Sequence, residues 1–302
     1  IVLRSQTDSH QEGWSAEMKS LVPLIAFTAI LCGGLVEAQQ SGIRLLVRAD
    51  DIGTAQAVNE ACIKSYQEGI VRSVELMVPG PWFLDAVRLL KENPDLDVGV
   101  HLTLTSEWEG LKWRPLTHSP SLVDTDGYFR PMTRQRSDFP PGTGFLEAQP
   151  NLAEVERELR AQIETAQRHL GKQVSHISSH MGTATATPEL AALTRRLAEE
   201  YGLRMQFPGL KSGGSFGSLK STAEQREQLL VELIERLPPG QWCVIEHPGL
   251  DTPEMRGIGH KGYENVAADR AGVTHAFTSA RVKEAVARRG VNLISYAEVA
   301  DD

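Results

Sequence analysis

Two adjacent carboxylates, Asp50 and Asp51, follow the apolar run from Ile43 to Ala49. In α/β proteins the carboxyl ends of parallel strands carry the active site. Neighbouring like charges repel each other, and such a pair is typical of a site where one carboxylate binds a metal ion and the other moves protons. The alternative interpretation is that the pair caps the helix predicted to follow.

Three histidines occupy comparable positions farther along the chain. His101 lies near the end of the predicted strand 97–105, His180 ends a later strand, and His247 follows the strand 242–246. If these strands belong to one barrel, their carboxyl ends converge on one mouth and the side chains meet there. A single histidine in a strand is more often structural, but the shared position of all these residues favours a joint site.

The types of these residues indicate a particular chemistry. One carboxylate and two imidazoles suit Zn²⁺ and other divalent ions, and they leave a coordination position open for water. Such an ion lowers the pKa of that water and polarises a carbonyl oxygen. A second carboxylate can take the proton of the water, and a histidine across the pocket can protonate a leaving amine. This set of groups is what amide or ester hydrolysis requires.

Strands and helices are predicted to alternate from Ile43 onward. The predicted strands are 43–49, 71–78, 97–105, 174–179, 203–207, 242–246 and 291–295, and the predicted helices are 54–68, 81–92, 151–170, 188–201, 222–237 and 278–289. Thr54 is the expected cap of the first helix, and 106–150 and 248–275 are expected to be long loops. Repeated βα units imply a parallel sheet. We therefore expect an α/β fold, a TIM-like (β/α) barrel, complete or irregular, with about seven parallel strands.

The composition is that of an ordinary soluble globular protein. The 302 residues are 41% hydrophobic and 23% charged, with a formal net charge of −8 and a pI of about 5.7. No run rich in Lys or Arg occurs, which argues against a nucleic-acid partner and favours a neutral or weakly charged substrate. No glycine-rich phosphate-binding motif follows a predicted strand, which argues against nucleotide binding.

The N-terminal region has the features of a secretory signal. A short basic region at Met18 is followed by an apolar stretch at 21–31 and by small residues before Ala38. We expect 18–38 to be a signal peptide cleaved after Ala38, 1–17 to be an upstream non-native segment, and 39–302 to be a single barrel domain. The protein is then exported from a bacterial cytoplasm, to the periplasm or outside, with no membrane span after cleavage. A buried N-terminal helix is the alternative.

Removal of this signal leaves two cysteines, Cys62 and Cys243. They can form one disulfide in an oxidising compartment, or remain two buried thiols in a helix and a strand. Their spacing is not a metal-binding signature.

Five motifs follow one another along the chain. They are ADDIG at 49–53, GIVRSV at 69–74, LMVPGPWF at 76–83, GVHLTLT at 99–105 and SHISSHMG at 175–182. Together they resemble the YdjC-like carbohydrate deacetylases, also called the chitooligosaccharide deacetylase family, over about 43–299. The resemblance implies a (β/α) barrel, one divalent metal ion (Mg²⁺ or Zn²⁺), and removal of acetyl groups from N-acetylated amino sugars or oligosaccharides. Homodimers are common in the family, which leaves a homodimer open here.

The resemblance also implies roles for individual residues. Asp50 matches the catalytic base, and Asp51, His101 and His180 match the metal ligands. His247, in Glu-His-Pro-Gly, matches the histidine proposed to act as the acid.

The segment 106–115 is expected to line the pocket. Its residues Trp108, Trp113 and Arg114 are the candidates for substrate binding. The two tryptophans either stack on a sugar ring or pack under the loop.

Two positions depart from the family pattern. The family usually has Asp-Ser-His where this chain has Ser178-Ser-His180, and many relatives have a further histidine where Gly182 stands. If the usual aspartate supports a metal-binding histidine, Ser178 lowers the metal affinity, or another carboxylate substitutes for it.

The leading hypothesis is therefore a metal-dependent carbohydrate deacetylase, a hydrolase of carbon–nitrogen bonds in linear amides. A catalytically impaired carbohydrate-binding barrel is a second hypothesis, motivated by Ser178. A metal hydrolase acting on another bond, such as a phosphoester, is a third. The acidic net charge and the lack of clustered Arg near the motifs weigh against it.

Overall fold

The strand β1 (Ile43–Ile52) forms the centre of a parallel sheet. Its apolar side chains are buried, as expected for a strand covered on both faces. β6 (Gly240–Glu246) pairs with one edge of β1. The other edge is shared, because β7 (Asn292–Ile294) pairs with the beginning of β1 and β2 (Ser73–Leu76) pairs with its end. The structure is a computed structural model that describes residues 42–301, so the predicted segments 1–17 and 18–38 lie outside the described residues.

The sheet curves into a barrel that is open on one side. Its order is β4-β3-β2-β1-β6-β5, with β7 off this path, where β3 is Asp97–Leu102, β4 is Val174–Ser179 and β5 is Leu210–Ser212. Within residues 42–301, β4 and β5 do not pair. The chain nevertheless passes from Arg204, which bridges to β4, directly to β5. Six residue steps span at most about 20 Å, which limits the distance between the two edges. The sheet is a half-barrel with its open side between β4 and β5.

The predicted fold class is thus confirmed, but the predicted strand 203–207 is wrong. Only Arg204 pairs there, through hydrogen bonds with Ser175 and Ile177 on the outer edge of β4. The neighbouring residues leave the edge of β4, so the pairing stops after one bridge. The strand after this segment is instead β5, which pairs with β6.

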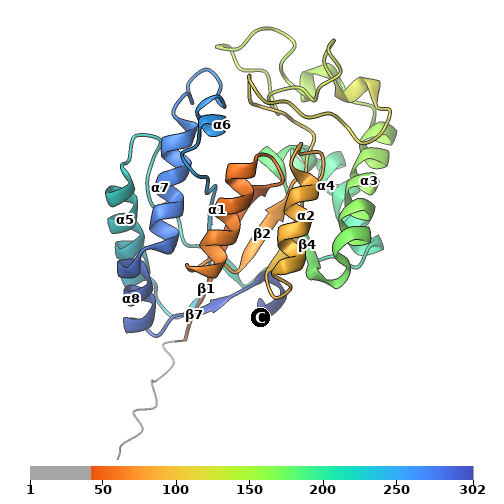
Figure 1. Ribbon diagram of the computed structural model, residues 1–302. Coiled ribbons are helices and arrows are strands. Elements are labelled where there is room, and N and C mark those ends of the chain that lie inside the picture. The colour runs from red at the N-terminus through yellow and green to blue at the C-terminus, as the bar shows by residue number, and fades with distance from the viewer. Residues whose placement is uncertain (1–41, 302) are drawn as a thin grey trace, which may run out of the picture. The chain divides into compact units, whose positions relative to one another are not determined.

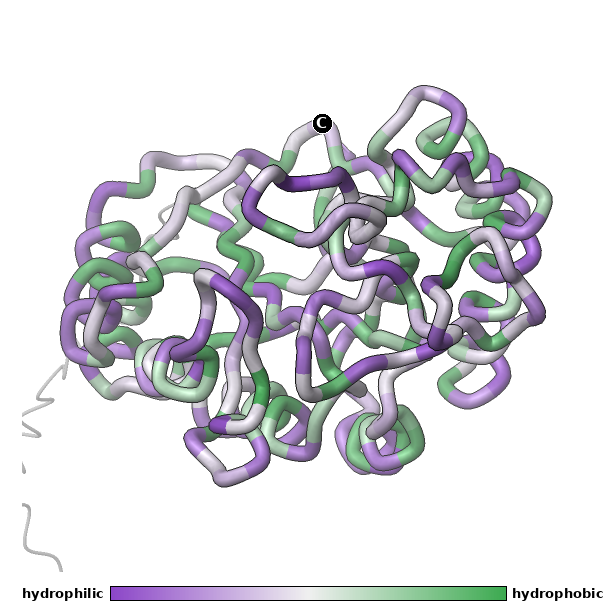
Figure 2. Tube along the Cα trace, turned by 90° about the horizontal axis from the view of Figure 1, so that it is seen from above, coloured by the Kyte–Doolittle hydropathy of each residue, from purple (hydrophilic) through white to green (hydrophobic). Residues whose placement is uncertain are grey.

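Helices surround the sheet, and the long loops gather where the strands end (Figure 1). The helices are α1 (Gln56–Gln67), α2 (Phe83–Glu92), α3 (Leu152–Leu170), α4 (Pro188–Glu200), α5 (Ala223–Arg236), α6 (Pro253–Arg256), α7 (Val266–Thr278) and α8 (Ala280–Arg288). Short 3₁₀ segments are η1 (Pro120–Leu122), η2 (Leu146–Ala148), η3 (Gly171–Gln173), η4 (His180–Thr185) and η5 (Tyr296–Glu298). Hydrophilic and hydrophobic residues alternate along the surrounding helices (Figure 2).

The helix α3 illustrates why these segments are helical. Val155, Leu159, Ile163 and Ala166 recur at helical spacing and are buried, so one face of the helix packs on the sheet. The side chain of Asn151 accepts a hydrogen bond from Ala153 N and caps the first turn. The helix is thereby fixed at its start and along its length.

Two predictions about helices are wrong. The segment 248–275 is not a loop, because it contains α6 and most of α7. α7 is buried around most of its circumference, so its sequence lacks the polar face that marks a surface helix. Thr54 does not cap α1, whose N-cap is Ala55; its hydroxyl donates instead to the carbonyl of Asp51 at 2.8 Å.

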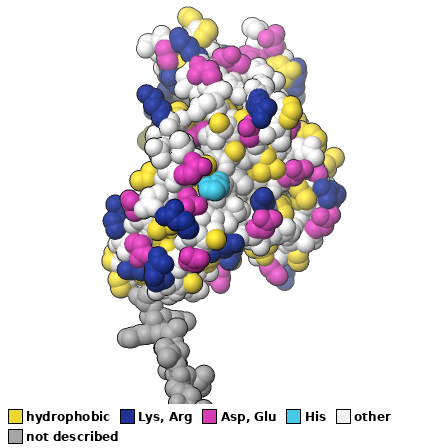
Figure 3. Space-filling view, turned by 60° about the vertical axis from the view of Figure 1, so that its left-hand side comes forward, with side chains coloured by type: hydrophobic (Ala, Val, Ile, Leu, Met, Phe, Trp, Pro, Cys, Tyr) yellow, Lys and Arg dark blue, Asp and Glu magenta, His cyan; other side chains and the backbone are white. Residues whose placement is uncertain are grey.

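Three further features bear on the expectations from the sequence. Cys62 and Cys243 are both free and buried. No helix within residues 42–301 is long and apolar enough to cross a bilayer. Acidic and basic side chains are interspersed over the face shown in Figure 3.

Candidate metal centre

Three strands bring the predicted ligands together at their carboxyl ends. Asp51 lies near the end of β1, His101 in β3, and His180 directly after β4. Asp51 Oδ1 lies 3.7 Å from His101 Nε2 and 3.4 Å from His180 Nδ1. One candidate ligand atom from each of the three residues lies within 4.8 Å of the other two. Side chains from three separate βα units therefore face one point inside the barrel mouth.

A left-handed backbone at Asp51 places the two adjacent carboxylates on the same side. In a regular strand, neighbouring side chains point to opposite faces. Asp51 has a φ of 74°, and the pairing of β1 with β2 shifts its register between Ala49 and Ile52. As a result, His101 Nε2 lies 3.8 Å from Asp50 Oδ2 as well as 3.7 Å from Asp51 Oδ1. This conformation costs about 1–3 kcal/mol in a non-glycine residue, and such strain is typical of functional sites.

The donor set fits a divalent cation. Within the described part of the chain, Asp51 Oδ1 is buried without a hydrogen-bond partner, whereas Oδ2 accepts from Arg270 Nη2 at 2.8 Å. His180 Nδ1, at 3.4 Å, is too far away for a normal hydrogen bond. A buried acceptor left unpaired costs about 1–3 kcal/mol, and a cation held between the carboxylate and the two imidazoles would satisfy it.

The charges of the three side chains differ. Burial would raise the pKa of Asp51, but the Arg270 guanidinium and the nearby imidazoles hold that pKa well below its usual range. Burial lowers the pKa of His101 to about 4. Burial also opposes a charge on His180, yet the carboxylates of Glu107 and Asp51 outweigh it and raise the pKa of His180 to about 10. Without a metal ion near neutral pH, His101 is therefore neutral, whereas His180 is protonated on both ring nitrogens and carries a positive charge.

Each histidine of the candidate site contacts a partner on its far side. His180 Nε2 donates to Glu107 Oε2 at 2.9 Å. His101 Nδ1 lies 2.6 Å from Ser178 Oγ. Such outer partners fix the orientation of metal-binding histidines and tune their affinity.

Asp50 is oriented by a neighbouring guanidinium. Arg48 Nε and Nη2 donate to Asp50 Oδ1 and Oδ2, both at 2.6 Å, which fixes the carboxylate in one plane. His247 Nε2 lies 3.9 Å from Asp50 Oδ2. The His247 side chain is 40% exposed, so it is the most accessible member of the predicted set. The structure therefore places all five predicted catalytic and metal-binding residues in one cluster.

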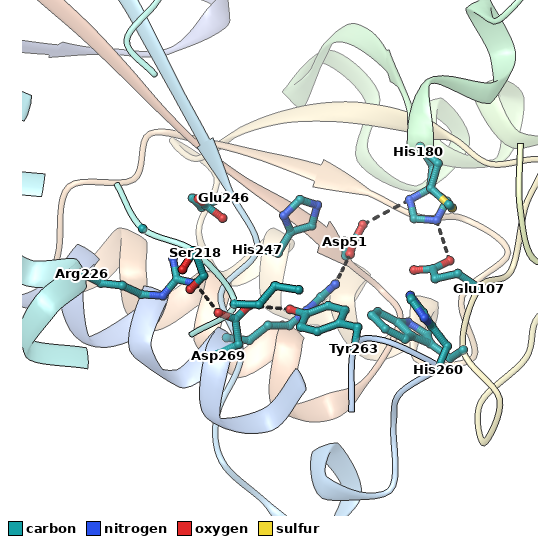
Figure 4. A pocket seen from close by; sticks show the side chains of 15 residues that line it. Asp51, Glu107, His180, Ser218, Arg226, Glu246, His247, His260, Tyr263 and Asp269 are labelled. Atoms are coloured by element: carbon teal, nitrogen blue, oxygen red, sulfur yellow. Dashed lines mark hydrogen bonds and ion pairs between the residues drawn. The ribbon is translucent and has the colours of Figure 1, made fainter. Parts of the chain in front are cut away.

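A cavity of about 550 Å³ opens beside this cluster. Figure 4 shows Asp51 between His247 and His180, with Glu107 beside His180 and Glu246 beyond His247. The loop residues that close the cavity come from segments far apart in the sequence, around 107, 181, 218 and 260. Its size is typical of a small-molecule site.

Only one of the three predicted substrate-binding residues lines this cavity. Trp108 does so, and its ring already contacts His260, Tyr263 and the Arg270 guanidinium. Trp113 lies behind the site, where its Nε1 donates to Thr105 O at 2.7 Å and its ring meets His180 edge-on. Arg114 stacks on Tyr128, and neither it nor Trp113 is among the residues that line the cavity.

The charged partners of the site are not evident from the amino-acid sequence. Glu107 lies in the segment 106–115 that was expected to line the pocket, but nothing marks it as the partner of a histidine. Arg270 lies in a segment predicted to be a loop, and the structure places it in α7. Arg48 lies two residues before Asp50, and side chains at that spacing in a strand share one face. This spacing is the one feature of the sequence that could have predicted the contact between Arg48 and Asp50.

Comparisons with known proteins give a consistent result. The sequence profile of the family described as YdjC-like protein matches residues 44–288. A protein of Brevibacillus brevis named carbohydrate deacetylase is 30% identical over 275 residues, which are 85% of this chain and 100% of that protein. A Thermus thermophilus protein of the same name is 33% identical over 238 residues, 71% of this chain and 80% of that protein.

A solved structure has a similar fold. It is the crystal structure of a proposed cellobiose-phosphate cleavage protein from Enterococcus faecalis. The two align with a TM-score of 0.66 and 25% identity, over 86% of this chain and 99% of that one.

Proposed function

This chain belongs to the YdjC-like protein family, and from this premise we propose that it is a carbohydrate deacetylase that uses one divalent metal ion. The proposed reaction hydrolyses the acetamide of an N-acetylated amino sugar, alone or in an oligosaccharide. The carrying observation is the buried Asp51 Oδ1, which has no hydrogen-bond partner within residues 42–301 and lies between two imidazoles, with a second carboxylate beside it. The family relatives named carbohydrate deacetylase support the substrate class.

Asp51, His101 and His180 would hold the ion. When bound, a divalent ion would polarise the acetyl carbonyl and lower the pKa of a water molecule. Arg270 donates to Asp51 Oδ2, the oxygen that does not face the histidines, and so holds the Asp51 carboxylate with its other oxygen toward them. The two candidates for the bound ion are Mg²⁺ and Zn²⁺.

Asp50 is the proposed general base. Like Asp51, Asp50 has a carboxylate oxygen close to His101 Nε2. Both oxygens of Asp50 accept hydrogen bonds from Arg48, so the orientation of the carboxylate is fixed. From this position Asp50 takes the proton of the attacking water. Arg48 holds Asp50 in this position while the proton moves.

His247 is the proposed general acid. It lies beside Asp50 at 3.9 Å, lines the cavity, and is open to solvent on one side. A histidine there can donate a proton to the leaving nitrogen and recover one from water. The expelled amine and acetate then leave through the cavity.

Acetate release tests this proposal. Purified protein is incubated with a panel of N-acetylated sugars and oligosaccharides, with chelator and with added Zn²⁺ or Mg²⁺, and acetate is measured. We expect release that stops with chelator and returns with metal. The Asp50→Asn variant should retain the metal and lose acetate release by a factor of roughly 10²–10⁴. Full activity in that variant would refute the assignment of the base.

We also propose that the protein is exported, on the basis of the signal-like segment 18–38. Fractionation of bacteria that express the chain from Met18 tests this. Protein in the periplasm or medium, shortened at Ala38, supports export, whereas uncleaved protein in the cytoplasm contradicts it.

A further inference from the structure

A carboxylate on β2 reaches across β3 to Ser178 on β4, which contacts the candidate ligand His101. Glu75 lies in β2 and is fully buried. Its Oε2 accepts a hydrogen bond from Ser178 Oγ on β4, and its Oε1 accepts from His176 Nε2 at 2.7 Å. The strand β3 runs between them, so the side chain of Glu75 crosses over β3.

Gly99 makes this crossing possible. In the sheet register, Glu75 pairs with Gly99, and Gly99 pairs with His176. A Cβ at position 99 would overlap Glu75 Oε2 and would lie 2.5 Å from His176 Nε2. The absence of a side chain at this point of β3 therefore opens the space that the carboxylate occupies.

The hydrogen bonds beyond Glu75 determine which nitrogen of His101 is protonated. A carboxylate has no hydrogen to donate, so Ser178 Oγ must donate its single proton to Glu75. Ser178 Oγ then accepts from His101 Nδ1, at 2.6 Å. His101 Nδ1 therefore carries the hydrogen, and the lone pair of Nε2 points toward Asp51.

We propose that Glu75 is a positioning residue for the metal ligand His101 and acts on it through Ser178. The proposal rests on the proposed metal-dependent function. Glu75 then supplies the support that an aspartate at position 178 is expected to give in the family pattern. Glu75 also lies 3.6 Å from Arg48, which orients Asp50, so one buried carboxylate contacts the supports of both the ligand and the proposed base.

Metal affinity of the purified chain, measured by titration calorimetry with Zn²⁺ and with Mg²⁺, tests the proposal. We expect Ser178→Ala and Glu75→Gln each to weaken binding by about 10–100-fold, the usual effect of removing an outer partner of a metal ligand. Ser178→Thr keeps the hydroxyl and should retain the wild-type affinity. Ser65→Ala is the matched control, because Ser65 is also buried but has no hydrogen-bond partner among the described residues.

A rescue variant and a spectroscopic measurement complete the test. Adding Ser178→Asp to Glu75→Gln places a carboxylate directly beside His101 and should recover most of the lost affinity. In metal-free wild-type protein, ¹⁵N NMR of the histidines should show His101 protonated at Nδ1. Thermal melts confirm that each variant is folded before its affinity is compared.

The outcomes separate the two proposals. Unchanged affinity in folded Ser178→Ala and Glu75→Gln, or His101 protonated at Nε2, would overturn the role of Glu75 alone. The expected affinity losses without any acetate release would overturn the deacetylase function and leave the role of Glu75 standing. A wild-type chain that binds neither metal would overturn both.

Discussion

The substitution Gly99→Ala tests the crossing of Glu75 over β3 most directly. Its backbone lies outside the left-handed region, so alanine is allowed there and any effect comes from the added methyl group. That methyl group would overlap Glu75 Oε2 and press on His176. Both neighbours are buried, so they have little room to move aside.

The expected loss of stability follows from two contributions. Overpacking a tight core site costs about 1–3 kcal/mol, and loss of a hydrogen bond to a charged group costs a further 1.5–3 kcal/mol. Together these predict a fall of about 3–6 kcal/mol in the free energy of unfolding. At about 2–4 °C per kcal/mol for a domain of this size, the Tm should fall by roughly 6–24 °C.

Calorimetry and denaturant titration measure this change. Gly202→Ala is the control, because Gly202 has a φ of 65° and no atom within 4 Å of an added Cβ, so only a backbone cost of about 1–2 kcal/mol is expected. A double-mutant cycle with Glu75→Ala then isolates the contact, since Gly99→Ala should cost less once the carboxylate is gone. A Tm of Gly99→Ala within 2 °C of wild type, or strict additivity in the cycle, would refute the steric argument.

Two further predictions concern the metal centre. The pKa of His180 is raised to about 10, so below that pH a divalent ion must displace the proton on the nitrogen that faces Asp51. Calorimetry in buffers of different ionisation enthalpy should therefore show the release of about one proton on metal binding. The metal affinity should rise about tenfold per pH unit near neutrality. Glu107→Gln should reduce this proton release, and an unchanged value would contradict the contribution of Glu107. His247→Asn should lower acetate release about 10²–10⁴-fold and leave the metal affinity unchanged. A matching loss of metal affinity would contradict the role of His247 as a general acid that does not take part in metal binding.

The elements that sequence predicts well are those whose pattern is local. β1 is a continuous apolar run, and α3 repeats its buried residues at helical spacing. Because parallel strands end at the same side of a sheet, a correct order of strands and helices already places Asp51, His101 and His180 near one another. The three predicted ligands could therefore be expected to lie near one another before the structure was known.

The elements that sequence misses depend on contacts between distant segments. α7 has no polar face, so it has no helical pattern to detect, and Arg270 within it was not recognised. Trp113 has the residue type expected of a sugar-binding platform, yet its position behind His180 is fixed by the fold of the 106–115 segment. Such placements follow from packing, and periodicity carries no information about them.

Position 178 shows how a motif can mislead when it is considered along one strand only. In sequence, Ser178 in place of an aspartate indicates that a carboxylate has been lost. In the structure a carboxylate is present, but it comes from Glu75 on β2 and reaches Ser178 across Gly99 on β3. The sequence contains one signal of this, since a glutamate in the buried strand Ser73–Leu76 requires a partner. That partner depends on three neighbouring strands at once, so the motif on β4 alone does not reveal it. With Glu75 unchanged, an aspartate at position 178 would bring two buried carboxylates together, and we expect this substitution to weaken metal binding.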